Sequence, residues 1–243
     1  VIDRFHPDIP PRHLRRHISP LWLDFKTSGA DQLEFCIELA RLEPTHRVLD
    51  VACGVGRFAL PLTNYLRQPG SYEGLDPDKD AIAWCRDHIT RMHPSFRFTV
   101  ADVATPQDRS RTYAAATYRF PYDARTFDVT YAGSLFTHLT EDGARNYLGQ
   151  IAAVLRPGGR FVCTWLLFNS QSTQMLSGRS METLWPVNCG TYRIMDPMEP
   201  ELSVLYNEAS VRAWYADAGL SIIEPIRVDA TYCPSRIPME RSE

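Results

Sequence analysis

The 243-residue sequence lacks any apolar run of about 18 residues, the shortest length that lets a helix cross a membrane. Its longest apolar stretch, 161–168, has the length of a buried strand. The first residues, 1–20, are rich in proline, histidine and arginine and lack the apolar centre of a signal peptide. We therefore expect a cytoplasmic protein with no segment bound in a membrane.

No long run of basic residues occurs. The formal net charge is −3, and the densest basic cluster consists of Arg12, Arg15 and Arg16. Three neighbouring arginines are typical of a solvated surface, whereas a general nucleic-acid-binding face needs a larger basic patch. We expect a small-molecule substrate and no nucleic-acid partner.

Disulfide and metal patterns are missing as well. The six cysteines stand at positions 36, 53, 85, 163, 189 and 233, where no pair has CxxC spacing and no cysteine and histidine group has the spacing of zinc ligands. We therefore expect reduced, mostly buried thiols and no metal site. No Walker sequence occurs, which excludes a P-loop nucleotide site.

The sequence does contain enough apolar material for a large core, with 44% hydrophobic and 23% charged residues, and we expect one domain over 1–243. Strand patterns are found at 47–51, 71–75, 96–101, 127–131, 160–168 and 220–228. Helical patterns are found at 31–42, 57–66, from 77 onward, 140–155 and 207–219. This alternation predicts an α/β fold with a mostly parallel, twisted sheet and helices on both faces.

One stretch, 48–57, organises the rest. An apolar strand ends with Asp50 and Val51, a tight turn carries Gly54 and Gly56, and a helical pattern begins near Arg57. Glycine permits unusual φ values and close approach of a ligand. The ends of the later strands carry Asp76, Asp102 and 132–134, which a parallel sheet brings to its carboxyl edge, so we expect one shared crevice.

Two cofactor classes compete for this crevice. The segment 54–59 formally matches the dinucleotide pattern G-x-G-x-x-A, although one match of this kind is weakly specific. The alternative comes from five ordered segments, VLDVACGVGRFALPL, EGLDPD, FTVADV, FDVTYAGSLFTHL and LRPGGRFVCTW. Together they resemble the motifs of the class I S-adenosylmethionine-dependent methyltransferases over about 31–228. The later segment 201–226 resembles a bacterial-type subgroup that acts on small molecules.

The resemblance implies a Rossmann-like fold with strand order 3-2-1-4-5-7-6 and S-adenosylmethionine as cofactor. It implies that Asp50 lies near the cationic end of the cofactor, that Asp76 accepts both ribose hydroxyls, and that Asp102 binds the adenine amino group. The full set of implied cofactor-binding residues is Asp50, Ala52, Cys53, Gly54, Gly56, Arg57, Asp76, Pro77, Asp102, Val103, Ala132 and Gly133. Ala52 replaces the first glycine of the family pattern, and we expect a negative φ there to accommodate its methyl group.

Methyl transfer from a sulfonium is an in-line displacement that depends mainly on holding the two reactants close together. A hydroxyl acceptor also benefits from a general base. The candidate is His138, just past the fourth strand, and its alternative role is structural. His13 and His17 on the N-terminal arm are the other candidates.

The remaining segments complete the expected organisation: an arm or lid at 1–29, a cofactor-binding core at 30–168, an acceptor-side insert at 169–202, and a helix and strand at 203–243. Aromatic residues in these segments favour O-methylation of an apolar or aromatic metabolite. N-methylation, cofactor binding without transfer, and a nicotinamide oxidoreductase remain alternatives. Residues 229–243 carry no alternating apolar pattern, so the seventh strand is expected to be short or missing, and the exposed edge could favour a homodimer.

Overall fold

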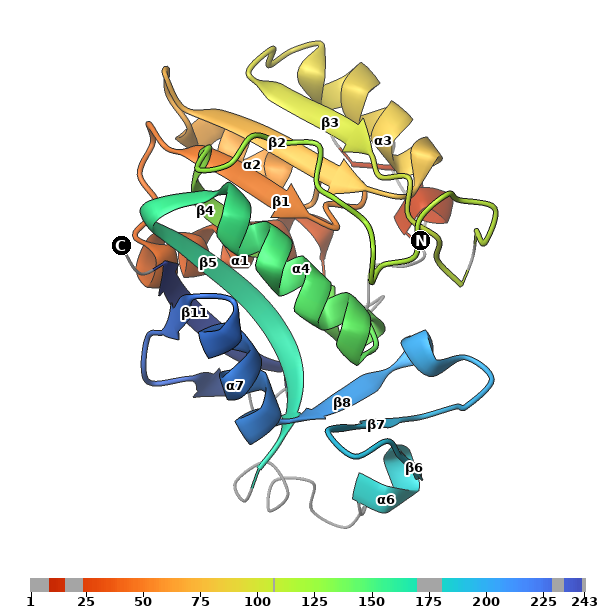
Figure 1. Ribbon diagram of the computed structural model, residues 1–243. Helices are drawn as coiled ribbons and strands as arrows, with labels where there is room; N and C mark the ends of the chain where they lie inside the picture. Colours follow the sequence, from red (N-terminus) through yellow and green to blue (C-terminus); the bar gives the residue numbers. More distant parts are fainter. Residues whose placement is uncertain (1–8, 16–23, 107, 170–180, 229–233, 242–243) are drawn as a thin grey trace. The chain divides into compact units, whose positions relative to one another are not determined.

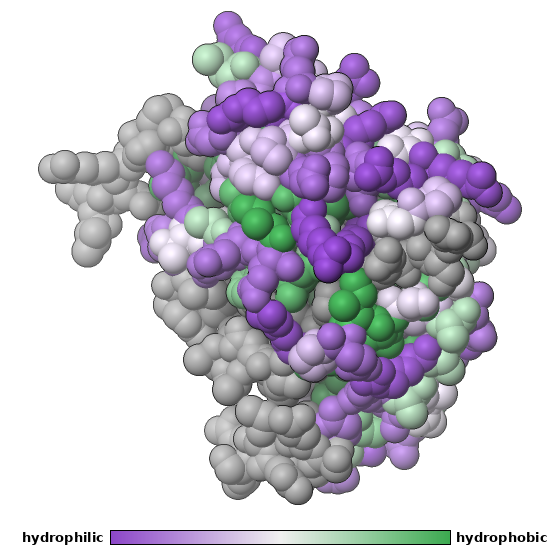
Figure 2. Space-filling view, turned by 90° about the vertical axis from the view of Figure 1, so that its left-hand side faces the viewer, coloured by the Kyte–Doolittle hydropathy of each residue, from purple (hydrophilic) through white to green (hydrophobic). Residues whose placement is uncertain are grey.

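The computed structural model describes residues 9–15, 24–106, 108–169, 181–228 and 234–241, the side chains of 228 and 234–241 excepted (Figure 1). The chain divides into two compact units, Val1–Ala101 and Asp102–Glu243, and each is described by itself. No helix among the described residues is both long enough and apolar enough to cross a membrane. The face drawn in Figure 2 is mainly hydrophilic, with small hydrophobic patches between the polar side chains.

The first unit contains three parallel strands in the order β3-β2-β1. Their bounds are β1 Arg47–Val51, β2 Ser71–Asp76 and β3 Phe96–Val100. All but the first residue of β1 are buried, as expected for a strand covered on both faces. The predicted strands 47–51, 71–75 and 96–101 therefore match the structure to within one residue at each end.

The helices of this unit are η1 Arg12–Arg15, α1 Phe25–Ala40, α2 Ala59–Tyr65, α3 Lys79–Cys85 and a π-helical turn, η2, at Arg86–Thr90. Helix α1 begins six residues before the predicted Asp31, because the Asp24 carboxylate caps it by accepting a 2.8 Å hydrogen bond from the Thr27 backbone N–H. The expected boundary between arm and core, at residue 30, therefore falls inside a helix.

In the second unit, β4 Phe127–Ala132 pairs in parallel with β5 Leu155–Phe168. The pairing shifts register between Phe127 and Val129 on β4, where the partners change from Leu155 to Arg160. The intervening segment, which includes Gly158 at φ 72°, separates the predicted helix 140–155 from the predicted strand 160–168. Helix α4, Glu141–Val154, leads into β5 and lies alongside it (Figure 1).

The seventh strand is present, which corrects the expectation that it is very short or missing. It is β11, Pro234–Arg241, which has eight residues. It pairs antiparallel with β5 on one side and with β9, Leu220–Ile222, on the other. The local order β5-β11-β9 reproduces the 5-7-6 part of the family order. Its backbone pairing with β5 and β9 defines the position of the strand. The sequence pattern did not predict this strand because prolines 234 and 238 interrupt it. The predicted strand 220–228 divides into β9 and β10, Arg227–Val228.

The acceptor-side insert, which had no clear periodicity, contains a hairpin. Helix α6, Met181–Leu184, precedes β6 Val187–Asn188, β7 Tyr192–Ile194, η4 Pro200–Leu202 and β8 Val204–Asn207. Strands β7 and β8 are antiparallel, and β8 also pairs in parallel with the end of β5. Helix α7, Glu208–Asp217, follows directly with Asn207 as its N-cap. Such short strands, set by pairing with neighbours, give almost no sequence signal.

Candidate cofactor site and catalytic histidine

The glycine turn of the first unit is tied to the end of β2. The backbone N–H groups of Ala52 and Cys53 both donate to the Leu75 carbonyl oxygen, at 2.8 and 3.2 Å. The Gly56 N–H donates to the Cys53 carbonyl at 3.0 Å and closes the turn. The turn between β1 and α2 therefore has a fixed position relative to the carboxyl end of β2.

Asp76 completes this arrangement. One carboxylate oxygen accepts a 2.7 Å hydrogen bond from the Gly54 N–H, and the other accepts a 2.8 Å bond from the Asp78 N–H. The side chain is 8% exposed, and burial raises its pKa to about 6 despite these two donors. Each carboxylate oxygen keeps a second lone pair, so Asp76 retains the capacity to accept two ribose hydroxyls.

The two glycines of the turn differ in what their missing side chains permit. Gly54 has φ +51°, and a Cβ built there would meet no atom within 4 Å, so open space lies beside its backbone. Gly56 has φ +73°, and a Cβ would lie 2.8 Å from Ile89 Cδ1. Gly54 therefore leaves room for a ligand, whereas Gly56 is needed for packing against η2.

Ala52 contradicts one expectation. Its φ is +63°, in the left-handed region, and not the negative value expected to accommodate a methyl group. A non-glycine residue in this conformation is strained by roughly 1 kcal/mol. The two backbone bonds that Ala52 and Cys53 make to Leu75 hold the turn in this geometry.

Asp50 lies inside the unit, 2% exposed, and accepts a 2.7 Å hydrogen bond from the Tyr72 hydroxyl. Burial raises its pKa to about 7, although Tyr72 opposes the shift. The Arg57 guanidinium donates to Ser28 Oγ of α1 at 3.2 Å. Arg57 thus braces the turn against α1, and its direct contact with the cofactor stays a prediction.

Cys53 is buried, and burial raises the pKa of its thiol well above the ordinary value. A thiol held neutral is a poor nucleophile, so Cys53 acts as a small residue of the turn. Its sulfur fills the space that the missing Cβ of Gly74 leaves, 2.8 Å from that position. The five cysteines in the described part of the chain, 36, 53, 85, 163 and 189, are all free thiols.

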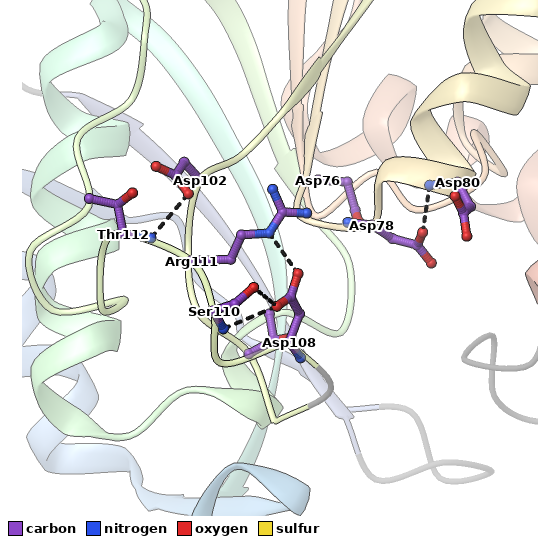
Figure 3. A network of polar contacts seen from close by, with 9 residues as sticks. Asp76, Asp78, Asp80, Asp102, Asp108, Ser110, Arg111 and Thr112 are labelled. Carbon is purple, nitrogen blue, oxygen red and sulfur yellow. Dashed lines mark hydrogen bonds and ion pairs between the residues drawn. The ribbon is translucent and has the colours of Figure 1, made fainter.

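Asp102 opens the second unit at the base of a closed loop. Its carboxylate accepts a 3.1 Å hydrogen bond from the Thr112 N–H, as Figure 3 shows, and Thr112 lowers its pKa. Its carbonyl accepts from the Tyr113 N–H, and the buried Val103 forms an isolated bridge with Tyr113. At the far end of the loop, Asp108 binds Ser110 and Arg111 (Figure 3). Asp102 is therefore ionised and able to accept from an adenine amino group.

The segment after β4 is tightly packed. Ala132 is fully buried, and a Cβ at Gly133 would lie 2.5 Å from the Tyr131 hydroxyl oxygen. Ser134 has φ +61°, and its N–H donates to Thr164 Oγ1 on β5 at 2.7 Å. Gly133 thus makes room for the Tyr131 ring, and a cofactor contact by Ala132 or Gly133 stays a prediction.

His138 ends the 3₁₀-helix η3, Phe136–His138, and its side chain is exposed. Its Nδ1 lies 3.0 Å from the Glu201 carbonyl oxygen in η4. Burial raises the pKa of the half-buried Glu201 carboxyl, while Arg109 and His138 oppose that shift. The structure thus brings His138 to the tip of the β7–β8 hairpin, within the predicted acceptor-side insert.

Buried aromatic residues of β5, β8 and α7 hold η3 in place, among them Trp165, which the sequence had placed with the aromatic side chains of the acceptor pocket. Phe136 stacks on Trp165 with ring centroids 4.2 Å apart, and Trp165 Nε1 donates to the Tyr215 hydroxyl at 2.7 Å. The Tyr206 hydroxyl donates to the Leu139 carbonyl, directly after η3. All three rings behind η3 are fully buried. The only available signal was the aromatic content of β5, β8 and α7.

His13 lies in η1, and His17 lies outside the described residues. Pro77 follows Asp76 and precedes Asp78, the N-cap residue of α3. The Asp78 carboxylate accepts a 2.9 Å hydrogen bond from the Asp80 N–H (Figure 3). Among the residues described, no group of three or more His, Cys, Asp or Glu side chains is arranged to hold a metal ion. Convergence of the two units' residues on one crevice stays a prediction.

Comparison with known proteins agrees with this geometry. Residues 48–159 match the methyltransferase domain family. A ubiquinone biosynthesis O-methyltransferase of Bradyrhizobium sp. (strain ORS 278) is 32% identical over 128 residues, which are 52% of this chain and 42% of that protein. The chain thus spans about two fifths of the length of the curated relatives that it matches first.

Solved structures share the fold. An S-adenosylmethionine-dependent methyltransferase of Methanosarcina mazei superposes with a TM-score of 0.58 at 15% identity, over 83% of this chain and 94% of that one. Magnesium protoporphyrin IX methyltransferase of Synechocystis PCC 6803, solved with bound SAH, gives 0.57 at 15% identity, over 89% and 83%. The domain matched over residues 48–159, the similar curated methyltransferases and the shared fold support a class I S-adenosylmethionine-dependent methyltransferase, a class whose cofactor is S-adenosylmethionine.

Proposed function

We propose that this protein transfers a methyl group from S-adenosylmethionine to a hydroxyl group of an apolar or aromatic small molecule. The observation that carries the proposal is the Asp76 carboxylate at the end of β2, bonded to the Gly54 N–H beside open space. A fixed carboxylate next to an uncovered glycine turn suits a ligand with ribose hydroxyls and a charged methionine part.

When bound, S-adenosylmethionine supplies an electrophilic methyl carbon. Asp76 would accept hydrogen bonds from the ribose hydroxyls, Asp102 would accept one from the adenine amino group, and the Gly54 backbone would leave room for the methionine part. His138 Nε2 takes the proton of the acceptor hydroxyl as its oxygen forms the new bond to the methyl carbon. S-adenosylmethionine would supply the methyl group by cleavage of its carbon–sulfur bond, and the products would be a methyl ether and S-adenosylhomocysteine.

Two observations favour an apolar hydroxyl acceptor. The loop between β7 and β8, which contacts His138, exposes Met195, Met198 and Leu202, at 41%, 83% and 47%. The first relative is named for O-methylation in ubiquinone biosynthesis, although it is matched over only part of its length. Cytoplasmic location and a homodimer stay predictions.

Titration calorimetry with S-adenosylhomocysteine and with NADH tests the cofactor first. Binding of S-adenosylhomocysteine alone is expected, and binding of NADH alone would contradict the assignment. Transfer of a labelled methyl group is then measured across matched phenols, alcohols and amines. Transfer to amines only would indicate N-methylation, and cofactor binding without any transfer would indicate a binding protein.

A His138→Asn variant tests the base. Transfer is expected to fall at least about 10²-fold, because the hydroxyl proton then has no acceptor. S-adenosylhomocysteine affinity is expected to stay the same. Unchanged transfer to a phenol would show that His138 is structural.

A further inference from the structure

Within the described part of the chain, the His138 ring has a hydrogen-bond partner at Nδ1, and that partner fixes which nitrogen carries the proton. Nδ1 lies 3.0 Å from the Glu201 carbonyl oxygen. A carbonyl oxygen can only accept a hydrogen bond, so Nδ1 must carry the proton. In the neutral ring this leaves the lone pair on Nε2, which is the form that a general base needs.

The accepting carbonyl is itself held by local structure. Glu201 lies in η4, where the Leu202 N–H donates to the Glu199 carbonyl at 3.0 Å. On the hairpin below it, the Met195 N–H donates to the Ser203 carbonyl at 3.3 Å, and Trp185 Nε1 donates to Ser203 Oγ at 3.0 Å. These hydrogen bonds therefore fix the position of the Glu201 carbonyl.

The histidine is held equally well from its own side. Its backbone N–H donates to the Leu135 carbonyl at 2.9 Å, and Phe136, two residues earlier, stacks on Trp165. The Leu139 carbonyl accepts from the buried Tyr206 hydroxyl of β8. Since β8 is also a strand of the hairpin, one rigid group of residues places both partners of the bond.

We propose that the tip of the β7–β8 hairpin is a positioning element, in which the Glu201 carbonyl holds His138 in its Nδ1–H tautomer and keeps Nε2 available as a base. The proposal rests on the proposed function for its catalytic meaning. The tautomer itself is a property of the protein alone and is measurable without cofactor or acceptor.

The direct test is ¹⁵N NMR of the histidine rings of the full chain at a pH where they are neutral. The His138 signals are assigned by their loss in His138→Asn. The Nδ1–H form is expected to dominate, and a dominant Nε2–H form in the unmodified protein would overturn the proposal whether or not any variant folds. Failure of the proposed function appears separately, as absence of S-adenosylhomocysteine binding or of methyl transfer.

A hairpin variant tests the role of the tip. Replacing 196–202 by Asn-Gly joins Met195 and Ser203, which are already hydrogen-bonded, through a two-residue turn and removes the Glu201 carbonyl. A mixture of tautomers is expected, with kcat roughly 3- to 10-fold lower and an unchanged affinity for S-adenosylhomocysteine. Glu199→Gln, which keeps the tip backbone, is the control. An unchanged tautomer in the folded short variant would contradict the proposal.

Two substitutions of the histidine give an independent readout. An asparagine amide can donate from the position of Nδ1 and keep the bond to Glu201, whereas a glutamine amide lies nearer the position of Nε2. His138→Asn is expected to keep the melting temperature of the unmodified protein, and His138→Gln to lower it by several degrees. Equal melting temperatures for the two variants would contradict the proposal that the Glu201 carbonyl holds the His138 ring through Nδ1.

Discussion

The Gly54 backbone N–H donates a 2.7 Å hydrogen bond to the Asp76 carboxylate, although the two residues are 22 positions apart in the sequence. This bond joins the turn after β1 to the end of β2. It makes Asp76 a structural acceptor, and we propose that the same carboxylate is also a ligand of the cofactor.

Replacing Asp76 by Asn should weaken S-adenosylhomocysteine binding by at least about 10-fold, because the amide keeps only one acceptor oxygen for ribose and for two backbone donors. Isothermal titration calorimetry measures the change. Asp80→Asn, in the same acidic segment but without a bond to the turn, is the matched control and should bind as the unmodified protein does. Equal affinity in both variants would remove Asp76 from the ribose site.

Cofactor affinity should also depend on pH. Burial raises the pKa of Asp76 to about 6, so its carboxyl gains a proton as the pH falls below that value. The protonated group accepts fewer hydrogen bonds, and affinity should fall from pH 7 to pH 5. Titrations with Asp76→Asn should lack this dependence, and an equal decline in the variant would assign it to another group.

Asp50 should make folding stability fall as the pH rises. Its folded pKa of about 7 lies above the unfolded value of roughly 4, so the folded state favours the neutral form. Its stabilising contribution is complete below about pH 4 and is lost as the pH approaches 7, an effect on the order of 4 kcal/mol.

The variant Asp50→Asn removes this titration and keeps an oxygen for the Tyr72 hydroxyl. Urea denaturation should show a higher free energy of unfolding than in the unmodified protein at pH 8, with a much smaller difference at pH 4. A variant that is less stable at pH 8 would contradict the prediction.

Replacing Ala52 by Gly should stabilise the protein by up to about 1 kcal/mol, because glycine adopts φ +63° without strain. The gain is reduced by the greater freedom of glycine in the unfolded chain. Ala83→Gly, at an exposed position inside α3, is the control and should destabilise by about 1 kcal/mol. Thermal denaturation of both variants decides whether the left-handed turn is strained.

The sequence by itself determined strands β1 to β5, because mainly apolar runs such as 48–51 must be buried to fold at all. It also predicted that Gly54, Asp76 and Asp102 each follow the end of a strand. Periodicity predicted the helices to within a few residues, except where Asp24 capped α1 early. These features depend on neighbours in the chain, which the sequence contains directly.

Tertiary structure decided what depends on partners distant in the chain. The sequence could not show that β11 pairs with β5, since its prolines conceal the strand pattern. Nor could it show that Ala52 has a positive φ, which the bonds of Ala52 and Cys53 to the Leu75 carbonyl impose. Nothing local to His138 indicates a contact with Glu201, 63 residues later. The tautomer of a ring is set by the atom opposite it, and only folding brings that atom there.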